Sequence, residues 1–399
     1  MNPDEVLRSG EKQLLVVPSV PVWRRGDELV FDQKFFEGML SYAALWPGSL
    51  KCAISATDQP LPVFGTVARA PQDIPFACTV LHHGEHLSAD HLKGVAVVLA
   101  AGDSFDQFHI GALCQAHGVK CVYIIEYIPE TRYQIVALST RNPVLRWRRY
   151  LYVWYGERKR RKAFRKADGL QSNGTPAYQE YSDFKNNLLY FDTRVGRNEI
   201  VDDATLAQRL SRLTECKPLR LAFSGRLERM KGVDHLVRLA KRMHDRHLPF
   251  HLSIFGSGSL EAELQEYVEQ NELQTVVSLL GAVDFHRELL PYLKQNIDLF
   301  ISLHRQSDPS CTYLETLSCG VPILGYNNKA FSGILRQADV GWGVSMDDLD
   351  AAVSAIIQLD RQRDTLAAKS QYSVRFARLH SFEDTNQRRI QQLVDLSNT

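Results

Sequence analysis

Short apolar runs rich in β-branched residues alternate along almost the whole chain with segments whose apolar positions recur at a helical period. Strands that alternate with amphipathic helices are typical of parallel βαβ units. Both halves of the chain are therefore predicted to be doubly wound α/β domains. The predicted strands are residues 13–17, 51–55, 95–101, 121–126, 169–173, 188–191, 219–224, 251–255, 275–280, 298–302 and 322–326.

A division of the chain is predicted between Val195 and Pro218, where a polar stretch with helical period (202–213) separates two strong strands. At 399 residues the chain is also longer than one hydrophobic core usually supports. We expect an N-terminal Rossmann-like domain over residues 1–200 and a C-terminal one over 201–380. Two such domains that face each other bring the carboxyl ends of their strands to a common cleft, where ligands bind.

Composition and charge restrict the class of protein. The chain is 44% hydrophobic and 23% charged, as in ordinary globular proteins, and its net charge of +1 argues against a dedicated nucleic-acid binder. The seven cysteines are scattered without a Cys-x-x-Cys pair, and no apolar run approaches the roughly 20 residues of a membrane span. Because residues 1–12 are polar and charged, we expect no signal peptide and a cytoplasmic protein.

Two patterns raise the question of a metal site. One is a group of four histidines, His82, His83, His86 and His91. No cysteine or paired acid joins them at a ligand spacing, so a solvated or cleft-lining loop is expected. The other is Asp348 and Asp350, which begin an alanine-rich helix and are expected to cap it. We therefore predict no metal site.

Basic residues follow the strand predicted at 219–224. Arg226 and Lys231 lie between the carboxyl end of this strand and the start of a helix. A guanidinium and an ammonium beside the free amides of a helix N-terminus form a site for a pyrophosphate. Gly225 lets the backbone leave the sheet tightly, and Gly232 allows close approach without a Cβ. The alternative is a solvated loop that only contains basic residues.

A Gly-x-Gly pair follows the next predicted strand. Gly256 and Gly258 would let the chain pass under a base or a ribose. The third glycine of a dinucleotide fingerprint is absent, because Glu261 occupies its place. A plain turn with Ser259 as the N-cap explains the pattern equally well.

The third segment joins a strand (298–302), an irregular polar loop (304–311) and a short helix (312–319). Ser310 is a good N-cap, so the amides of Thr312 and Tyr313 are expected to point toward an anion. Glu315 lies one turn into the helix, where a carboxylate can accept two hydrogen bonds from a ribose diol. Its alternative role is to stabilise the first turn of the helix.

Together these segments resemble glycosyltransferase family 4, the retaining enzymes of GT-B fold, over residues 218–345. The shared order is Gly-Arg-Leu-x-x-x-Lys-Gly, then Gly-x-Gly, then Leu-Glu-x-x-x-x-Gly-x-Pro. The resemblance implies that Arg226 and Lys231 bind the diphosphate of a nucleotide sugar and that Glu315 binds its ribose. It places Gly225, Gly256 and Gly258 in the nucleotide-sugar site and lets the backbone around Thr312, Tyr313 and Leu314 cap the phosphate. It further implies that the last helix (381–399) packs back on the N-terminal domain.

One departure from the family concerns the donor sugar. The family has two glutamates separated by seven residues, but the position eight before Glu315 holds Ser307, and the nearest acid is Asp308. We favour Asp308 as the residue that contacts the donor-sugar hydroxyls, in a catalytic role beside Arg226 and Lys231. The alternative is that Ser307 occupies the position and recognition of the sugar is altered.

The acceptor side matches the family less well. The loop at 17–27 carries Pro18 and Pro21 in place of a glycine-rich sequence, and its Arg24 is a candidate for the acceptor site. A histidine is often found after the fourth strand in the family, and here Glu126 stands at the cleft edge instead. Glu126 is therefore a second candidate, with a structural hydrogen-bonding role as the alternative.

The run from Arg146 to Lys166 has ten basic residues and one acid, interleaved with aromatic residues. Such a run can lie on anionic lipid with its aromatic rings in the interface and its cations at the headgroups. We favour this interpretation over a solvated helix, and it predicts a peripheral position at the inner face of the membrane.

The sequence therefore predicts a retaining glycosyltransferase that moves a sugar from a nucleotide-diphosphate sugar to a saccharide or lipid-linked acceptor. No cofactor is required, because Arg226 and Lys231 neutralise the departing diphosphate. Three alternatives stay open: a sugar-nucleotide epimerase on the same fold, a glycosyltransferase-like nucleotide-binding subunit without activity, and a nicotinamide-dependent oxidoreductase. The base, the sugar, the acceptor and the oligomeric state are not specified by the sequence.

Overall fold

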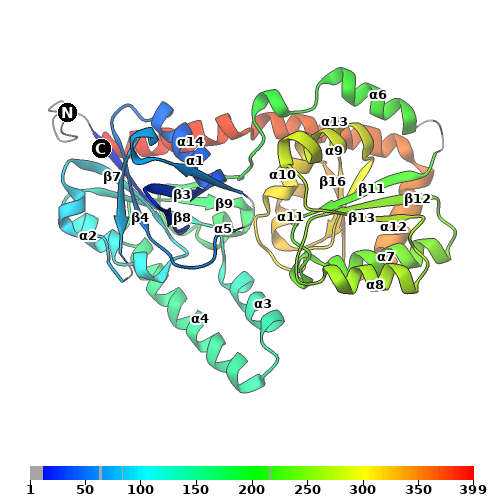
Figure 1. Ribbon diagram of the computed structural model, residues 1–399, viewed down its shortest axis with the longest axis horizontal. Helices are drawn as coiled ribbons and strands as arrows, with labels where there is room; N and C mark the ends of the chain where they lie inside the picture. The colour runs from blue at the N-terminus through cyan, green and yellow to red at the C-terminus, as the bar shows by residue number, and fades with distance from the viewer. Residues whose placement is uncertain (1–11, 63–64, 83, 214, 216) are drawn as a thin grey trace.

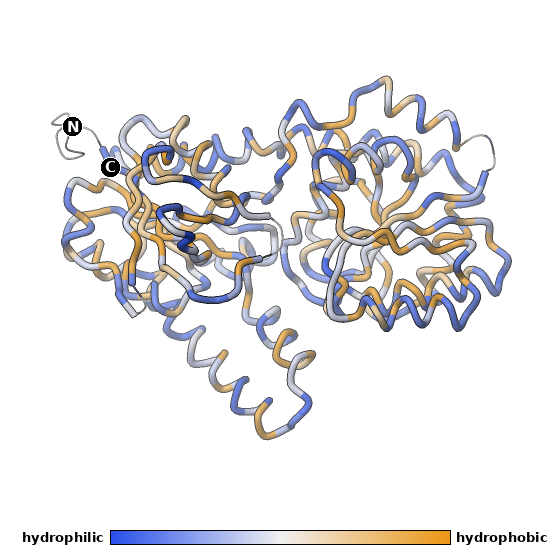
Figure 2. Tube along the Cα trace, in the orientation of Figure 1, coloured by the Kyte–Doolittle hydropathy of each residue, from blue (hydrophilic) through white to orange (hydrophobic). Residues whose placement is uncertain are grey.

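The computed structural model describes residues 12–62, 65–82, 84–213, 215 and 217–399. Two parallel sheets, each covered by helices, lie next to each other along the long axis of the molecule (Figure 1). Apolar residues follow the strands of both sheets (Figure 2), so each sheet forms the centre of its own core.

The first sheet has seven parallel strands in the order β10-β9-β8-β7-β1-β4-β6. They are β1 (Gln13–Val17), β4 (Leu50–Ser55), β6 (Ala77–Leu81), β7 (Val95–Ala101), β8 (Lys120–Ile125), β9 (Gly169–Asn173) and β10 (Asn187–Tyr190). In β1, Leu15 and Val17 join one buried cluster, whereas Leu14 and Val16 join another. Alternate side chains of one strand thus enter cores on opposite faces, as doubly wound sheets require.

Helices cover both faces of this sheet. Residues of α1 (Gln33–Leu45) share the cluster of Leu14, and residues of α2 (Ile110–Ala116) and α5 (Gly174–Glu180) share the cluster of Leu15. A small antiparallel sheet of β2 (Trp23–Arg25), β3 (Glu28–Asp32) and β5 (Thr66–Arg69) accompanies the first domain.

The second sheet has six parallel strands in the order β13-β12-β11-β14-β15-β16. They are β11 (Leu219–Ser224), β12 (Phe250–Phe255), β13 (Val277–Gly281), β14 (Leu299–Ser302), β15 (Ile323–Tyr326) and β16 (Gly341–Val344). One buried cluster contains residues of α7 (Val233–Asp245), α8 (Glu261–Gln270) and α12 (Leu349–Arg361). Another contains residues of α9 (Leu290–Asn296), α10 (Cys311–Ser318) and α11 (Lys329–Leu335).

The chain passes between the two sheets twice. It leaves the first through the segment that precedes α6 (Asp203–Leu213), and it returns through α13 (Arg363–Leu379) and α14 (Phe382–Ser397). In Figure 1, α13 and α14 run along one side of both sheets. Ile390 and Leu393 of α14 are buried in the same cluster as Phe36 and Met39 of α1, so the end of the chain completes the core of the first sheet.

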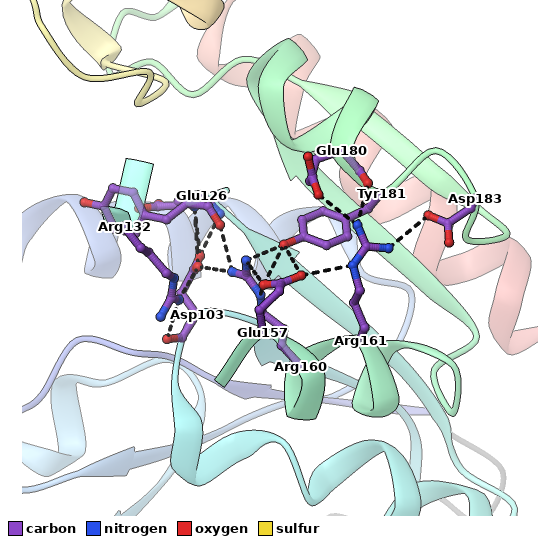
Figure 3. Close-up of polar contacts among 10 residues, drawn as sticks. Asp103, Glu126, Arg132, Glu157, Arg160, Arg161, Glu180, Tyr181 and Asp183 are labelled. Carbon is purple, nitrogen blue, oxygen red and sulfur yellow. Dashed lines mark hydrogen bonds and ion pairs between the residues drawn. The ribbon is translucent and has the colours of Figure 1, made fainter. Parts of the chain in front are cut away.

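A helical hairpin of α3 (Pro129–Ser139) and α4 (Pro143–Phe164) projects from the first sheet (Figure 1). The polar network of Figure 3 anchors the base of α4. There the fully buried Arg160 donates to Asp103 Oδ1 at 2.9 Å, to Tyr127 O at 2.7 Å and to the hydroxyl of Tyr181. Because these partners come from three separate segments, they fix the direction in which the hairpin leaves the domain.

The prediction of two doubly wound parallel sheets is confirmed. Each of the eleven predicted strands lies within two residues of an observed one. The sequence did not predict β2, β3, β5, β6 or β16, which are short or partly exposed, or contain glycine, and so lack a clear apolar run. The domain limits at residues 200 and 380 stay predictions.

Candidate functional site

The carboxyl edges of the two sheets meet at one seam, and contacts between the domains cross it. Lys34 Nζ of α1 donates to Cys311 Sγ of α10 at 2.8 Å. The backbone N–H of Ser307 donates to Gln134 Oε1 of α3 at 3.0 Å. Several of the candidate residues lie along this seam.

Arg226 and Lys231 follow β11 but differ in their surroundings. Arg226 is exposed, and its guanidinium forms no hydrogen bond or ion pair with any residue that the structure describes. Lys231 ends a short 3₁₀ turn, η6 (Arg229–Lys231), is buried, and donates to Asp308 Oδ2 at 3.0 Å. Gly232 then has a φ of 70°, and a Cβ there would lie 1.9 Å from Leu303 O. The glycine is required because the turn that carries Lys231 lies directly on the end of β14.

Asp308 and His304 surround the ammonium of Lys231. Burial opposes ionisation of Asp308, but the charge of Lys231, its hydrogen bond and contributions from neighbouring side chains together outweigh burial and lower the pKa of this carboxyl. Burial, together with the charge of Lys231, lowers the pKa of His304 to about 3, so the imidazole is neutral. Asp308 Oδ1 and both ring nitrogens of His304 are buried without a hydrogen-bond partner. The side chains of Asp308 and His304 therefore keep atoms next to Lys231 that could still form hydrogen bonds.

The Gly-x-Gly segment packs closely against the loop that follows β11. A Cβ on Gly256 would lie 1.9 Å from Gly225 O, and one on Gly258 would lie 2.6 Å from Leu227 O. The helix that follows begins at Glu261 with Leu260 as its N-cap, and Ser259 instead bonds to Glu228 at 2.7 Å. The expectation that Ser259 caps the helix is therefore wrong. A cavity of about 470 Å³ lies beside this segment, lined by Leu227, Ile254, Gly256, Glu261, Ala262, Gln265, Leu279 and Gly281.

The helix predicted at 312–319 is α10. Ser310 occupies its N-cap position, but its side chain makes no capping hydrogen bond. The amides of the first turn are thus left without a side-chain acceptor, as an anion site requires. Thr312 is half-buried, whereas Tyr313 and Leu314 are buried in the core, and the Tyr313 amide already donates to Ser310 O at 3.2 Å.

Glu315 is not free. Arg194 Nε, in the segment after β10, donates to Glu315 Oε1 at 2.8 Å, and the guanidinium of Arg194 lies 3.8 Å from the centre of the Phe285 ring. The sequence analysis did not find Arg194, because no motif surrounds it. A ribose diol at Glu315 would bind a carboxylate that is already paired.

Glu126 follows β8 at the seam. Its side chain is exposed, yet the surrounding protein and the negative charges of Asp192 and Asp103 raise its pKa to about 7. Arg24 is exposed on β2 and forms no contact with the other candidates among the residues described. The structure therefore places Glu126 at the seam and leaves Arg24 on the outer surface of the small sheet.

Several charged residues at the seam were missed by the sequence analysis. Lys34 also pairs with Asp192, which follows β10. Glu130 of α3 pairs with Lys329 of α11, and Ser307 Oγ lies 3.4 Å from Glu130 Oε1. These residues come from five separate segments, so no local pattern could have brought them together.

In the part of the chain that the structure describes, no group of three or more His, Cys, Asp or Glu side chains is placed to hold a metal ion. Asp348 caps α12 by accepting from Ala351 N at 2.9 Å, as expected. His83 of the histidine group lies outside the described residues.

Comparison with known families gives one match. Residues 208–374 match the family model described as glycosyl transferases group 1. The matched segment contains Arg226, Lys231, Asp308 and Glu315 and covers the second sheet.

Individual curated proteins match this chain over 105 to 171 residues. The GtfA subunit of UDP-N-acetylglucosamine–peptide N-acetylglucosaminyltransferase from Streptococcus pneumoniae is 24% identical over 171 residues, 40% of this chain and 32% of that protein. The part of this chain that matches the curated relatives spans only 22% to 37% of their own length.

Two solved structures extend over nearly the whole chain. Anabaena HepE in complex with UDP superimposes with a TM-score of 0.65 at 11% identity, covering 96% of this chain and 99% of that one. WaaG, a glycosyltransferase involved in lipopolysaccharide biosynthesis, does so with a TM-score of 0.62 at 12% identity, covering 95% and 99%. At such identities the likeness concerns the fold alone, and it confirms the predicted GT-B arrangement.

Among the described residues, no helix is both long enough and apolar enough to cross a bilayer.

Proposed function

We propose that this protein is a retaining glycosyltransferase that moves a sugar from a nucleotide-diphosphate sugar to a saccharide or lipid-linked acceptor. The observation that carries the proposal is the anion site formed by Arg226, Lys231 and the N-terminus of α10. Arg226 is exposed and unpaired, and the first turn of α10 lacks a side-chain cap. A diphosphate supplies the negative charge that this arrangement is built to receive.

The same groups act in the reaction. As the bond from the sugar to the phosphate breaks, negative charge develops on the leaving diphosphate, and Arg226, Lys231 and the amides of α10 stabilise it. This is electrostatic catalysis without a covalent intermediate. The leaving phosphate oxygen takes the acceptor proton, so no separate base is needed for retention. Neither a metal nor another cofactor enters this proposal.

Two features support a donor side on the second sheet. The match to glycosyl transferases group 1 lies there, and the cavity beside Gly256 has room for part of a nucleotide. The HepE structure is a complex with UDP, which makes uridine nucleotides the first donors to test. WaaG acts in lipopolysaccharide biosynthesis, so we propose a role in polysaccharide, lipopolysaccharide or glycolipid synthesis.

We further propose that α4 places the protein on an anionic membrane surface, from the cytoplasmic side. Val144, Trp147, Leu151 and Trp154 recur at helical spacing and are all exposed, with Trp147 at 65%. Basic residues flank this stripe, and Arg158 lies 3.9 Å from the Trp154 ring. Exposed aromatic residues between cations suit the interface of an anionic bilayer.

A thermal-shift panel tests the donor site. The panel contains UDP, ADP and GDP, each with its glucose and N-acetylglucosamine esters. A ligand at about 100 times its dissociation constant adds about 2.7 kcal/mol of stability, so binding raises the melting temperature measurably.

Variants of the anion site complete the test. Arg226→Ala and Lys231→Ala should each remove at least ~2.7 kcal/mol of transition-state stabilisation, about a hundredfold in kcat/KM. Arg378→Ala, far from the cleft on α13, is the matched control. If no nucleotide shifts the wild type, or if both site variants turn over normally, the proposal is wrong.

A further inference from the structure

The carboxylates of the second sheet that lie at the seam are already paired. Asp308 is held by Lys231, and Glu315 is held by Arg194. Each of these cations is matched by one acid, and both acids are buried. Asp308 Oδ1 has no hydrogen-bond partner, but both carboxylates are buried, so neither presents an exposed acceptor to the hydroxyl groups of a ligand.

A third carboxylate reaches the same loop from the other domain. Glu130 lies in the first turn of α3, and α3 packs against η6, which carries Lys231. Its Oε1 accepts from Ser307 Oγ at 3.4 Å and from Gln134 Nε2 at 3.3 Å, while its Oε2 pairs with Lys329. Ser307, which Glu130 contacts, directly precedes Asp308 in the sequence, and Asp308 is the residue that pairs with Lys231.

Glu130 keeps unused acceptor capacity. Its side chain is 38% exposed, and a carboxylate can accept about four hydrogen bonds. The two bonds to Oε1 are long and come from neutral donors, which a ligand hydroxyl can replace. Gln134 holds the Ser307 amide at 3.0 Å and so keeps the loop against α3 while Glu130 accepts a new donor.

From this geometry we propose that Glu130 contacts the sugar of the donor and determines which sugar is accepted. The inference rests on the proposed function, because it assumes a diphosphate at Arg226 and Lys231. A sugar attached to that diphosphate and directed toward the first sheet meets α3. An ionised carboxylate only accepts hydrogen bonds, so Glu130 selects a sugar with a free hydroxyl at the facing carbon.

Two variants separate this role from a purely structural one. Glu130→Gln keeps the shape but removes the charged acceptor, whereas Lys329→Gln breaks the ion pair across the seam and leaves the Glu130 carboxylate in place. Calorimetry measures the dissociation constants of both variants for the nucleoside diphosphate that shifts the wild type most in the panel and for its sugar ester. The melting temperature without ligand shows whether each variant is folded.

We expect Glu130→Gln to bind the nucleoside diphosphate within about twofold of the wild type. It should bind the sugar ester at least about tenfold more weakly, the usual loss for a hydrogen bond to a charged group. Lys329→Gln should change the affinity for the sugar ester by less than about threefold.

Three results contradict the inference in different ways. If Glu130→Gln binds the sugar ester as the wild type does, Glu130 does not contact the sugar. If both variants weaken both ligands equally, Glu130 only joins the two domains. If the wild type binds no member of the panel, the proposed function itself fails, and the inference fails with it.

Discussion

Charged side chains at the cleft are mostly paired with residues from other segments. Lys231 pairs with Asp308, Arg194 with Glu315 and Lys34 with Asp192. Arg226 differs, because it is exposed and its guanidinium forms no hydrogen bond or ion pair with a described residue. An anion that enters the cleft therefore finds one free guanidinium and an ammonium that shares its charge with Asp308.

The pair of Arg194 and Glu315 can be tested through stability. The side chain of Glu315 is 7% exposed and that of Arg194 is 36% exposed. Arg194→Ala leaves a buried carboxylate without its partner and should lower the free energy of unfolding by about 2 kcal/mol, less than for a fully buried pair because solvent reaches the arginine. Urea denaturation measures the loss. Arg194→Ala with Glu315→Gln should recover most of it; no recovery would mean that the two residues are not coupled.

Glu126 should make stability depend on pH near neutrality. Its raised pKa, about 7, means that the folded protein keeps a proton which the unfolded chain releases. The free energy of unfolding that this group contributes is therefore lost as the pH rises from the ordinary pKa of a glutamate toward 7. Compared with the wild type, Glu126→Gln should have a free energy of unfolding about 1 kcal/mol higher at pH 8 and the same at pH 4. The expected gain is kept small because solvent screens the exposed side chain. Denaturation at both pH values checks this, with the exposed Glu266→Gln as control.

Sequence patterns located residues that follow strands but not the partners that reach them across the cleft. Arg226, Lys231 and Glu315 lie in recognisable local patterns. Arg194, Lys34 and Glu130 come from the other domain, and their positions depend on how the two sheets meet. For the same reason, the sequence alone did not decide whether Ser307 or Asp308 takes the position of the family's first glutamate.

At the scale of elements, long apolar runs made the central strands predictable, whereas two of the four edge strands of the large sheets, β6 and β16, were missed. β6 lies at one edge of the first sheet, and its side chains are largely exposed or half-buried. β16 lies at the edge of the second sheet and contains two glycines. Where only one face of a strand is buried, little hydrophobic signal remains.

The exposed stripe of α4 makes a prediction about membranes. Trp147→Ala with Trp154→Ala should weaken binding to vesicles rich in phosphatidylglycerol at least about tenfold, because aromatic rings anchor such helices at the interface. Co-sedimentation measures the bound fraction. Tyr372→Ala on α13 removes another exposed aromatic side chain (42%) outside the hairpin and should have no effect. Equal binding of all three proteins would contradict the membrane proposal.

At the scale of the whole molecule, α14 makes the first sheet dependent on the end of the chain. Leu393 is fully buried in the cluster that contains Leu14 and Met39. Leu393→Ala should cost about 2 to 5 kcal/mol, and the loss should fall on the first sheet. Hydrogen exchange should show weaker protection in β1, β4 and β7 with β11 and β12 unchanged. Leu379→Ala, at a side chain that is 67% exposed, should cost little.

Since Leu393 and Ile390 belong to the core of the first sheet, that core stays incomplete while the chain is being synthesised. Tyr190 ends the last strand of this sheet, and Ile390 follows 200 residues later. At roughly 5 to 20 residues per second, the ribosome needs about 10 to 40 s to make the missing helix. During that interval the apolar surface that α14 covers in the folded protein is exposed, so the nascent chain should be a substrate for chaperones until α14 emerges.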